Sequence, residues 1–206
     1  MTNSAAKPVD PEVILTFWFG ELDELGRASK ACQDRWWSKD PALDEQIRQQ
    51  FGPTHAAAQH GELDSWLDTP RTRLAYIVVL DQFSRNMFRD TAAMFASDPL
   101  ALRAALTGID EGMHRQLRLD ERGIFYMPLM HCEELSNQER CVALFLELAN
   151  EVTGSARASM LSRVGFAERH RDIVKKFDRF PHRNALLGRE STPDEQEFLA
   201  GPGSSF

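Results

Sequence analysis

The sequence predicts an all-α fold, with antiparallel helix pairs arranged in one compact domain. Helix-start signals recur as an Asp or Thr followed by Pro, because the polar side chain caps free N–H groups and proline suits the first helical position. Apolar residues follow these starts at helical spacing, and no stretch alternates as a half-buried strand requires. The signals stand at Asp10, Asp40, Thr69, Asp98 and Thr192.

The first four helix starts are 30, 29 and 29 residues apart. This interval suits helix–turn–helix pairs, and helical solenoids repeat at slightly longer periods. The sequence lacks the Trp, Leu, Gly and Tyr consensus of a tetratricopeptide repeat. An irregular helical bundle therefore explains the spacing equally well.

Caps, apolar periodicity and breaks by glycine or proline set the boundaries of each helix. Capping boxes are expected at 136–139 and 192–195, and Gly52-Pro53 should interrupt the second helix. Residues 21–38 are polar and should form a loop with a short helix. The predicted helices span residues 11–19, 41–51, 54–61, 70–83, 99–116, 122–131 with a break at Pro128, 137–152, 155–178 and 193–199, of which 155–178 is the longest.

Two helices carry an apolar face that we expect to point inward. Leu74, Ile77 and Val78 share a helix face with Asp81, which places a carboxylate at the end of a buried stripe. The helix over 137–152 is strongly amphipathic, with an expected inward face of Val142, Phe145, Leu146, Ala149 and Val152.

The composition is that of an ordinary globular protein, with 206 residues of which 42% are hydrophobic and 27% are charged. This length suits a single domain over residues 1–206 that buries a sizeable core. Within it we expect a folded part over residues 9–200 and a loose tail over 201–206.

Charge and hydropathy exclude several classes of partner. The formal net charge of −7 argues against a nucleic-acid binder, which needs a basic face to neutralise phosphates. The sequence has no run of about 20 apolar residues, so we expect no membrane partner. Its first ten residues lack the apolar core of a signal peptide. The cysteines, Cys32, Cys132 and Cys141, are not in metal or redox spacing and indicate reduced thiols in a cytoplasmic protein.

Four segments rich in polar and aromatic residues distinguish the chain. Two stretches that overlap these segments, residues 81–86 and 178–184, share the order Asp, any residue, Phe, and then Arg-Asn after one or two further residues. The four segments closely resemble the bacterial DUF924 family, and the likeness covers nearly the whole chain, about residues 13–199. They are residues 80–89, 125–134, 170–177 and 179–192.

The resemblance implies an all-α fold related to tetratricopeptide-like helical arrays, which agrees with the spacing of the helix starts. It implies no reaction, because the family is named for having no established function. The chain departs from the family pattern at Ser84, where Pro is usual, at Asp178, where Gly is usual, and at Cys132, where Ser is usual. Asp178 adds a carboxylate beside Arg179.

The polar residues of these segments suggest a pocket that recognises a small anionic molecule. Arginine binds carboxylate or phosphate through two parallel hydrogen bonds, and asparagine adds a paired donor and acceptor. The candidate ligand-binding residues are Arg85, Asn86, Arg89, His131, Glu134, His170, Arg179, His182, Arg183 and Asn184.

The same arginines have a structural interpretation that the sequence leaves open. Arg85 and Arg183 could tie helix ends together, since structural ion-pair networks imitate functional sites. The carboxylates available for such ties are Asp81, Asp178, Glu121 and Glu134.

Histidines add a second kind of chemistry to the candidate site. His131, His170 and His182 fall in the family-like segments, and histidine is suited to proton transfer near neutral pH. A lone inward histidine such as His170 is nevertheless more often a core residue that is hydrogen-bonded to the backbone. Whether the protein is an enzyme therefore stays open.

A metal site is disfavoured by the spacing of its possible ligands. Glu111-x-x-His114 has the spacing used in di-iron bundles, but those need two such motifs and two further glutamates. His131 and Glu134 also stand three residues apart, but only one copy of the Glu-x-x-His spacing falls in a predicted helix. We expect no bound metal and no cofactor.

Two functional classes remain. One is a binder of, or an enzyme acting on, a small anionic compound; the other is a helical-repeat scaffold for a peptide or protein partner, and a homo-oligomer is compatible with both. A pocket should bring the turns at Arg85 and Arg183 together around His131, with Cα atoms within about 15 Å. A scaffold should show a long open groove along several helices. The concentration of distinctive residues in turns favours the pocket.

Overall fold

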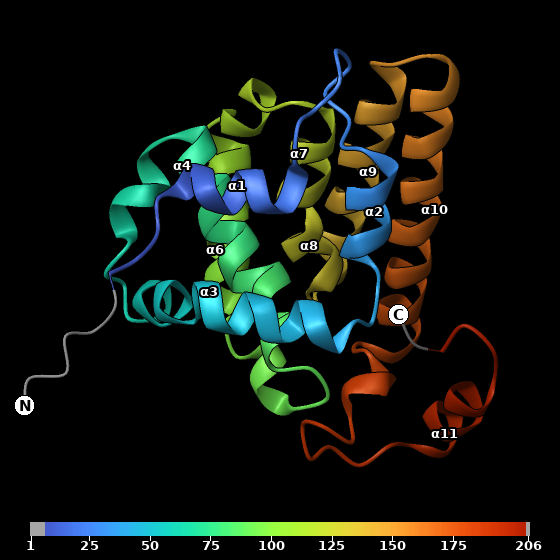
Figure 1. Ribbon diagram of the computed structural model, residues 1–206. Coiled ribbons are helices and arrows are strands. Elements are labelled where there is room, and N and C mark those ends of the chain that lie inside the picture. Colours follow the sequence, from blue (N-terminus) through green and yellow to red (C-terminus); the bar gives the residue numbers. More distant parts are fainter. Residues whose placement is uncertain (1–6, 205–206) are drawn as a thin grey trace, which may run out of the picture. The chain divides into compact units, whose positions relative to one another are not determined.

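The computed structural model describes residues 7–204, and within them every regular element is helical (Figure 1). The chain divides into two compact units, which are described separately below. The first unit comprises residues up to 89 together with 93–128, and the second comprises 90–92 together with the residues from 129 onward. The expectation of one domain over 1–206 stays a prediction. The expected tail reaches residues 205 and 206, which, like residues 1–6, lie outside the described part.

The first unit contains most of the short elements. Its α-helices are α1 (Pro11–Phe19), α2 (Lys30–Trp36), α3 (Pro41–Gln59), α4 (Pro70–Ile77), α5 (Ser84–Met87), α6 (Asp98–Asp110) and α7 (Leu119–Phe125). Between them lie η1 (Asp64–Asp68), the π-helix η2 (Val78–Phe83), η3 (Ala92–Phe95), whose first residue is assigned to the second unit, and η4 (Met113–Gln116). The chain then enters the second unit through α8 (Met127–His131), followed by α9 (Leu135–Asn150), α10 (Gly154–Phe177), η5 (Pro181–Arg183) and α11 (Pro193–Ala200).

The predicted helix starts are confirmed wherever the cap is local. The side chains of Asp10, Asp40, Thr69 and Thr192 each accept a backbone N–H bond from the first helical turn, and Thr192 forms the expected capping box. Asp98 is different, because α6 begins at Asp98 itself and the carboxylate binds Arg85 instead of capping. A tertiary ion pair has replaced the local bond.

The predicted capping box at 136–139 is wrong. Helix α9 begins two residues earlier than that box allows, at Leu135, and the residue at its cap position, Glu134, makes no side-chain cap bond. The carboxylate of Glu134 accepts a bond from the Asn137 side chain instead.

Gly52-Pro53 does not interrupt the second helix, contrary to the prediction, and α3 runs unbroken from Pro41 to Gln59. Proline removes one helical hydrogen bond and crowds the carbonyl four residues earlier. Pro53 and Gln49 both lie on the exposed side of α3, so water can solvate the carbonyl that loses its partner.

Two other helices end earlier than predicted. The helix expected over 70–83 changes from an α-helix to a π-helix at Val78. The residues of its predicted inward face, including Asp81, are nevertheless fully buried. The helix expected to reach Gln116 ends at Asp110, because Gly112 adopts a left-handed conformation with φ of 73° and starts the short η4 turn.

The core of the first unit is built around α4 and η2. Helices α1, α3 and α6 pack against this continuous segment (Figure 1). Phe83 lies at the centre, with its ring centroid 4.8 Å from Phe51 and 5.4 Å from Trp18. The loop before α2 is fastened by Asp120, whose carboxylate accepts the Ala28 N–H.

The second unit is organised by the long antiparallel pair α9 and α10, which lie side by side (Figure 1). The helix predicted as the longest is α10, and it is the longest of the described helices. On α9 the inward face includes Val142, Phe145 and Ala149 as predicted, but Leu146 is 40% exposed. Leu146 follows Phe145 by 100° of helix rotation and therefore leaves the face that contacts α10.

After α10 the chain reverses at Asp178, whose φ of 56° is left-handed. Phe180 then inserts into the core of this unit beside Ile173 and Val174. The chain continues through η5 to the capped start of α11, which returns Phe198 to within 5.1 Å of the Phe177 ring, measured between centroids. The turn after α11 folds back through a bond from Ser204 Oγ to the Leu199 carbonyl.

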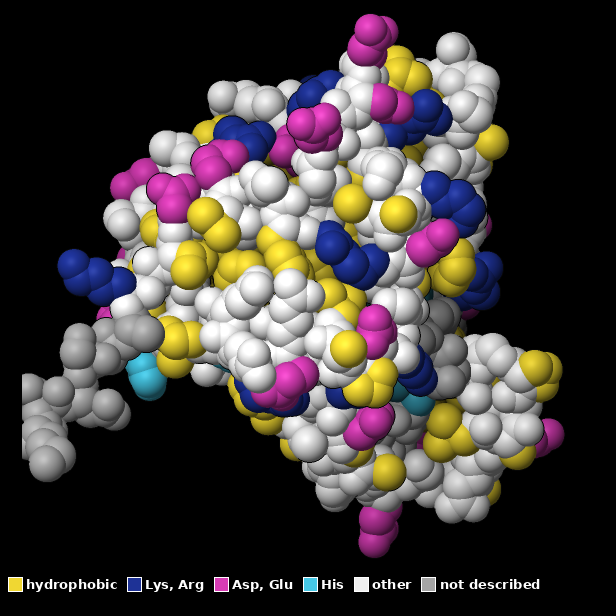
Figure 2. Space-filling view, in the orientation of Figure 1, with side chains coloured by type: hydrophobic (Ala, Val, Ile, Leu, Met, Phe, Trp, Pro, Cys, Tyr) yellow, Lys and Arg dark blue, Asp and Glu magenta, His cyan; other side chains and the backbone are white. Residues whose placement is uncertain are grey.

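The surface visible in Figure 2 carries acidic and basic side chains interspersed, in keeping with a chain whose net charge is only −7. Within residues 7–204, no helix combines the length and the apolarity that crossing a bilayer requires.

Candidate functional site

In the first unit, Arg85 is held by two carboxylates. Its guanidinium lies 2.9 Å and 3.1 Å from the two oxygens of Asp98 and 3.2 Å from Asp81. It also donates to the Asp81 carbonyl, 2.8 Å away. These bonds match the structural interpretation of Arg85 as a tie between helix ends.

Asn86 and Arg89 share a different carboxylate, that of Asp44 on α3. The Asn86 amide lies 2.8 Å from Asp44, and Arg89 reaches both oxygens at 2.6 Å and 2.8 Å. Burial alone would raise the pKa of Asp44, but the bonds from Arg89 and Asn86 outweigh it and hold that pKa below its ordinary value. The polar turn of the first unit thus anchors α5 to α3.

In the second unit, candidate side chains from two segments lie against the Phe180 ring, and one of them binds a third segment. The rings of His170 and His182 each have their centroid 5.6 Å from that of Phe180. The Arg183 guanidinium carbon lies 4.5 Å from the same centroid. Arg183 also donates to the carbonyl of His131 at 2.8 Å, which links the segment at α8. We call His131, His170, His182 and Arg183, together with Phe180, the Phe180 cluster.

Burial governs the protonation of the histidines in this cluster. Burial, followed by the neighbouring His131 and Arg183, lowers the pKa of His170 to about 3, although its bond to the Phe166 carbonyl acts in the opposite direction. Burial and then Arg183 lower the pKa of His182 to about 4. Both imidazoles are therefore neutral at physiological pH.

The tautomer of His170 follows from its backbone bond. Its Nδ1 lies 2.8 Å from the carbonyl oxygen of Phe166, one turn earlier on α10, and a carbonyl only accepts. Nδ1 therefore carries the hydrogen, and Nε2 of the neutral ring is an acceptor. His170 is thus both a core residue bonded to the backbone, as the sequence suggested, and a member of the Phe180 cluster.

An ion pair outside the candidate set braces this cluster. Glu133 accepts bonds from both terminal nitrogens of Arg189, at 2.7 Å and 2.9 Å, and from the Phe180 N–H at 2.8 Å. Burial alone would raise the pKa of Glu133, but these bonds lower it. Glu133 and Arg189 both lie inside the family-like segments. Their position in these segments is the sequence feature that could have added them to the candidate residues.

Three further candidate residues lie away from the Phe180 ring. Arg179 reaches both oxygens of Glu195 on α11, at 2.6 Å and 2.7 Å, and Asn184 donates to Ser191 and Glu195. The bonds from Arg179, followed by that from the Thr192 N–H, lower the pKa of Glu195 to about 2. Arg179 and Asn184 thus hold the chain between η5 and α11. Glu134 is exposed at the start of α9.

The Glu111-x-x-His114 spacing considered for metal binding is used otherwise. Glu111 lies 3.2 Å from Arg73, and the His114 ring packs against Tyr126 with centroids 5.7 Å apart. Across residues 7–204, no three His, Cys, Asp or Glu side chains converge as metal ligands.

Comparison with known proteins identifies the family. The sequence model of a family described as a bacterial protein of unknown function, DUF924, matches residues 14–203. The chain belongs to the DUF924 family. This DUF924 chain is similar to a protein of unknown function from Agrobacterium tumefaciens, whose solved structure shares 39% identity and a TM-score of 0.76 over 92% of this chain and 96% of that one. No curated protein matches significantly.

Membership in DUF924 confirms the resemblance read from the four segments and leaves the function open. The candidate residues of this DUF924 chain fall into two sets, one in each unit. Arg85 belongs to the first unit and Arg183 to the second, so the expectation that their turns are neighbours around His131 stays a prediction.

Proposed function

We propose that this DUF924 protein binds a small anion, a carboxylate or a phosphate, at the Phe180 cluster. The observation that carries the proposal is that the rings of His170 and His182 and the guanidinium of Arg183 converge on the buried Phe180 ring, while Arg183 also binds the His131 carbonyl. Arginine recognises carboxylate and phosphate through paired bonds, and neutral imidazoles can add donors or acceptors.

The electrostatic environment of the cluster supports an anionic ligand. Burial is the largest cause of the lowered pKa of His170 and of His182, and the positive charge of Arg183 lowers both further. Glu133 raises the pKa of His182, but both carboxylate oxygens of Glu133 are bound by Arg189. An anion that enters beside His182 gains attraction from these groups in a site of low dielectric.

The same pKa values favour binding over proton transfer. An efficient general acid or base has a pKa near the operating pH, whereas those of His170 and His182 are about 3 and 4. The proposal is therefore of a ligand-binding protein, and it includes no reaction.

The test is a titration of inorganic phosphate, with acetate as a second probe, followed by NMR of the histidine rings. A bound anion should raise the pKa of His182 by about one unit or more, because an opposite charge favours the imidazolium. Arg183→Gln should abolish the response. The matched control is Arg169→Gln, which replaces an exposed arginine of α10 that lies over the Phe166 ring.

Arg183 is buried, so a second variant guards against a failure to fold. His182→Gln replaces a half-buried ring and should weaken phosphate binding while leaving the fold intact. Ring resonances that do not move at tens of millimolar phosphate, or that move equally in Arg183→Gln and wild type, would reject the proposal.

A second candidate function is a tetratricopeptide-like scaffold for a peptide or protein. Antiparallel helix pairs are the building blocks of such arrays, and the α9–α10 pair exposes Leu146, Leu161 and Phe166 to 40%, 43% and 48%. Peptides selected on the wild-type protein should then fail to bind Phe166→Glu but still bind Leu187→Glu, a matched change at another exposed site of the unit. Equal binding to both variants would contradict this candidate.

We place the protein in the cytoplasm as part of the proposal. The free thiols of Cys32, Cys132 and Cys141 support this location, because a reducing compartment preserves them.

A further inference from the structure

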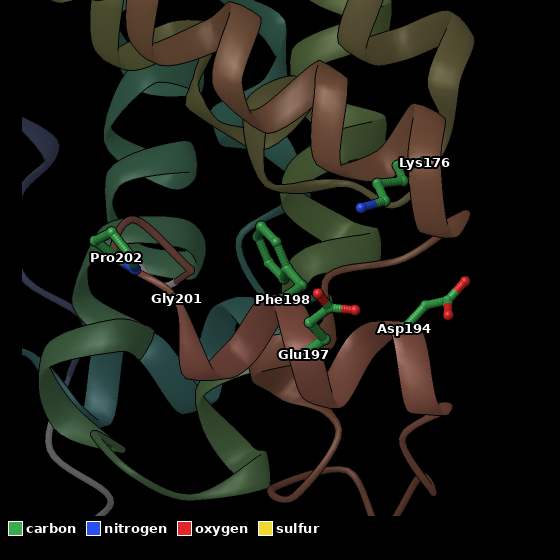
Figure 3. Close-up of a pocket in the computed structure, with 6 residues that line it drawn as sticks. All are labelled: Lys176, Asp194, Glu197, Phe198, Gly201 and Pro202. Carbon is green, nitrogen blue, oxygen red and sulfur yellow. The ribbon is translucent and has the colours of Figure 1, made fainter.

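The second unit has a surface hollow between the end of α10 and α11 that shares no residue with the Phe180 cluster (Figure 3). Its volume is about 490 Å³, within the range of small-molecule sites, about 300–1,000 Å³. An adjoining hollow of about 480 Å³ shares Lys176 and Asp194 with it. The first hollow is lined by Lys176, Asp194, Glu197, Phe198, Gly201 and Pro202.

Opposite charges face each other across this hollow. Figure 3 shows the ammonium group of Lys176 directed from α10 toward the space that Glu197 and the Phe198 ring border from α11. Lys176 lies over the Phe177 ring, 4.8 Å from its centroid. Among the described residues, no carboxylate approaches the Lys176 ammonium within the 4.0 Å of an ion pair. A ligand that carries both charges can therefore bridge the two walls.

The balance of charges in the lining narrows the class of ligand. Lys176 contributes one positive charge, and Asp194 and Glu197 contribute two negative charges, so the lining carries a net charge of −1. Asp194 and Glu197 stand three residues apart on α11 and therefore share one helix face. A ligand with one carboxylate and two cationic groups complements all three side chains.

Phe198 supplies the apolar part of the site. Its half-buried ring packs against Phe177, with centroids 5.1 Å apart, and lines the hollow beside the charged groups. An aromatic face attracts the aliphatic stem and the guanidinium or ammonium of a ligand. We propose that this hollow binds a basic α-amino acid, with the ligand carboxylate at Lys176 and its α-ammonium at Glu197.

The probe is L-arginine, and the comparison ligands are agmatine, which lacks the carboxylate, and L-glutamate, which reverses the side-chain charge. Titration followed by protein NMR should give a dissociation constant for L-arginine in the millimolar range, as expected for exposed charges. Agmatine should bind about fivefold more weakly, since one exposed ion pair is lost, and L-glutamate more weakly than L-arginine.

Variants test which charged side chain of the hollow binds which charged group of the ligand. In Lys176→Gln, L-arginine and agmatine should bind alike, because the residue that distinguishes them is gone. Glu197→Gln should weaken both by about fivefold. The matched control is Lys175→Gln, an exposed neighbour on α10 that does not line the hollow, and it should leave both affinities unchanged.

Equal binding of L-arginine and agmatine to the wild type would overturn the proposal, as would equal effects of the Lys175 and Lys176 variants. The absence of shifts at tens of millimolar L-arginine would also overturn it. The His182 ring should not respond to L-arginine, and Lys176→Gln should leave the response to phosphate intact. Failure of one site is thereby distinguished from failure of the other.

Discussion

At the scale of single residues, Asp178 shows how one position can carry a conformational cost. The residue ends α10 with φ of 56° and donates its N–H to the Val174 carbonyl at 2.7 Å. A side chain in this left-handed region costs about 1–2 kcal/mol, with less for Asp and Asn than for other residues. Glycine is usual at this position in the family pattern, so we expect Asp178 to make the fold less stable than glycine would.

We predict that Asp178→Gly raises the free energy of unfolding by up to about 1 kcal/mol, because glycine adopts this conformation without a Cβ clash. Urea denaturation with a shared slope measures the change. Asp178→Ala is the control and should lower stability, since alanine tolerates positive φ less well than aspartate. A Gly variant that is less stable than wild type would show that the carboxylate has a structural role.

His170 gives a prediction for pH dependence. Its pKa is about 3 in the folded protein against 6.5 for the unperturbed group, so between these values the unfolded chain binds more protons than the folded chain. Stability contributed by the neutral ring is thus complete above pH 6.5 and is lost as the pH falls toward 3. Because folded His170 binds a proton more weakly than unfolded His170, the free energy of unfolding falls by up to about 1.4 kcal/mol per pH unit in this window.

We predict that His170→Asn has a shallower loss of stability between pH 6.5 and pH 5 than the wild type. The asparagine amide can keep the bond to the Phe166 carbonyl, and ordinary carboxylates remain ionised over this window. Denaturant unfolding at a series of pH values measures both slopes. Parallel curves for the two proteins would mean that other groups account for the acid sensitivity.

At the scale of elements, two glycines in helices have opposite environments. A Cβ at Gly108 of α6 would lie 2.7 Å from Phe125 Cζ and 2.8 Å from Arg73 Cδ. A Cβ at Gly165 of α10 would meet nothing closer than 3.9 Å, the distance to Arg169. Gly108 is therefore required by close packing of α6, whereas Gly165 only lowers the helix propensity of α10.

We predict that Gly108→Ala destabilises the protein by about 1–3 kcal/mol, because overpacking exceeds the gain in helix propensity. Gly165→Ala is the matched substitution and should stabilise it by up to about 1 kcal/mol. Thermal or urea unfolding of both variants measures the contrast. Equal effects at the two positions would show that backbone propensity, and not packing, determines the outcome.

At the scale of the whole molecule, the sequence-based expectation of one domain makes a calorimetric prediction. A single cooperative domain unfolds in one transition whose calorimetric and van't Hoff enthalpies agree. We predict that agreement for this chain. Two transitions, or a calorimetric enthalpy well above the van't Hoff value, would instead show that the two compact units unfold independently.

The sequence by itself determined the features that rest on bonds between near neighbours. The caps at Asp10, Asp40, Thr69 and Thr192 are correct because donor and acceptor stand two or three residues apart. The all-α class and the family follow from the same local periodicity and from contiguous motifs. These signals survive folding because no distant partner competes for the groups involved.

Only the tertiary structure decided features in which a distant partner wins. Asp98 binds Arg85 across 13 residues instead of capping α6, and Glu133 meets Arg189 across 56 residues to brace the Phe180 cluster. The histidine rings that surround Phe180 became neutral through burial, which no spacing in the sequence reveals. The interactions and protonation of an ionic or buried group depend on the partners that folding brings within a few ångströms. The sequence pattern does not contain those distances.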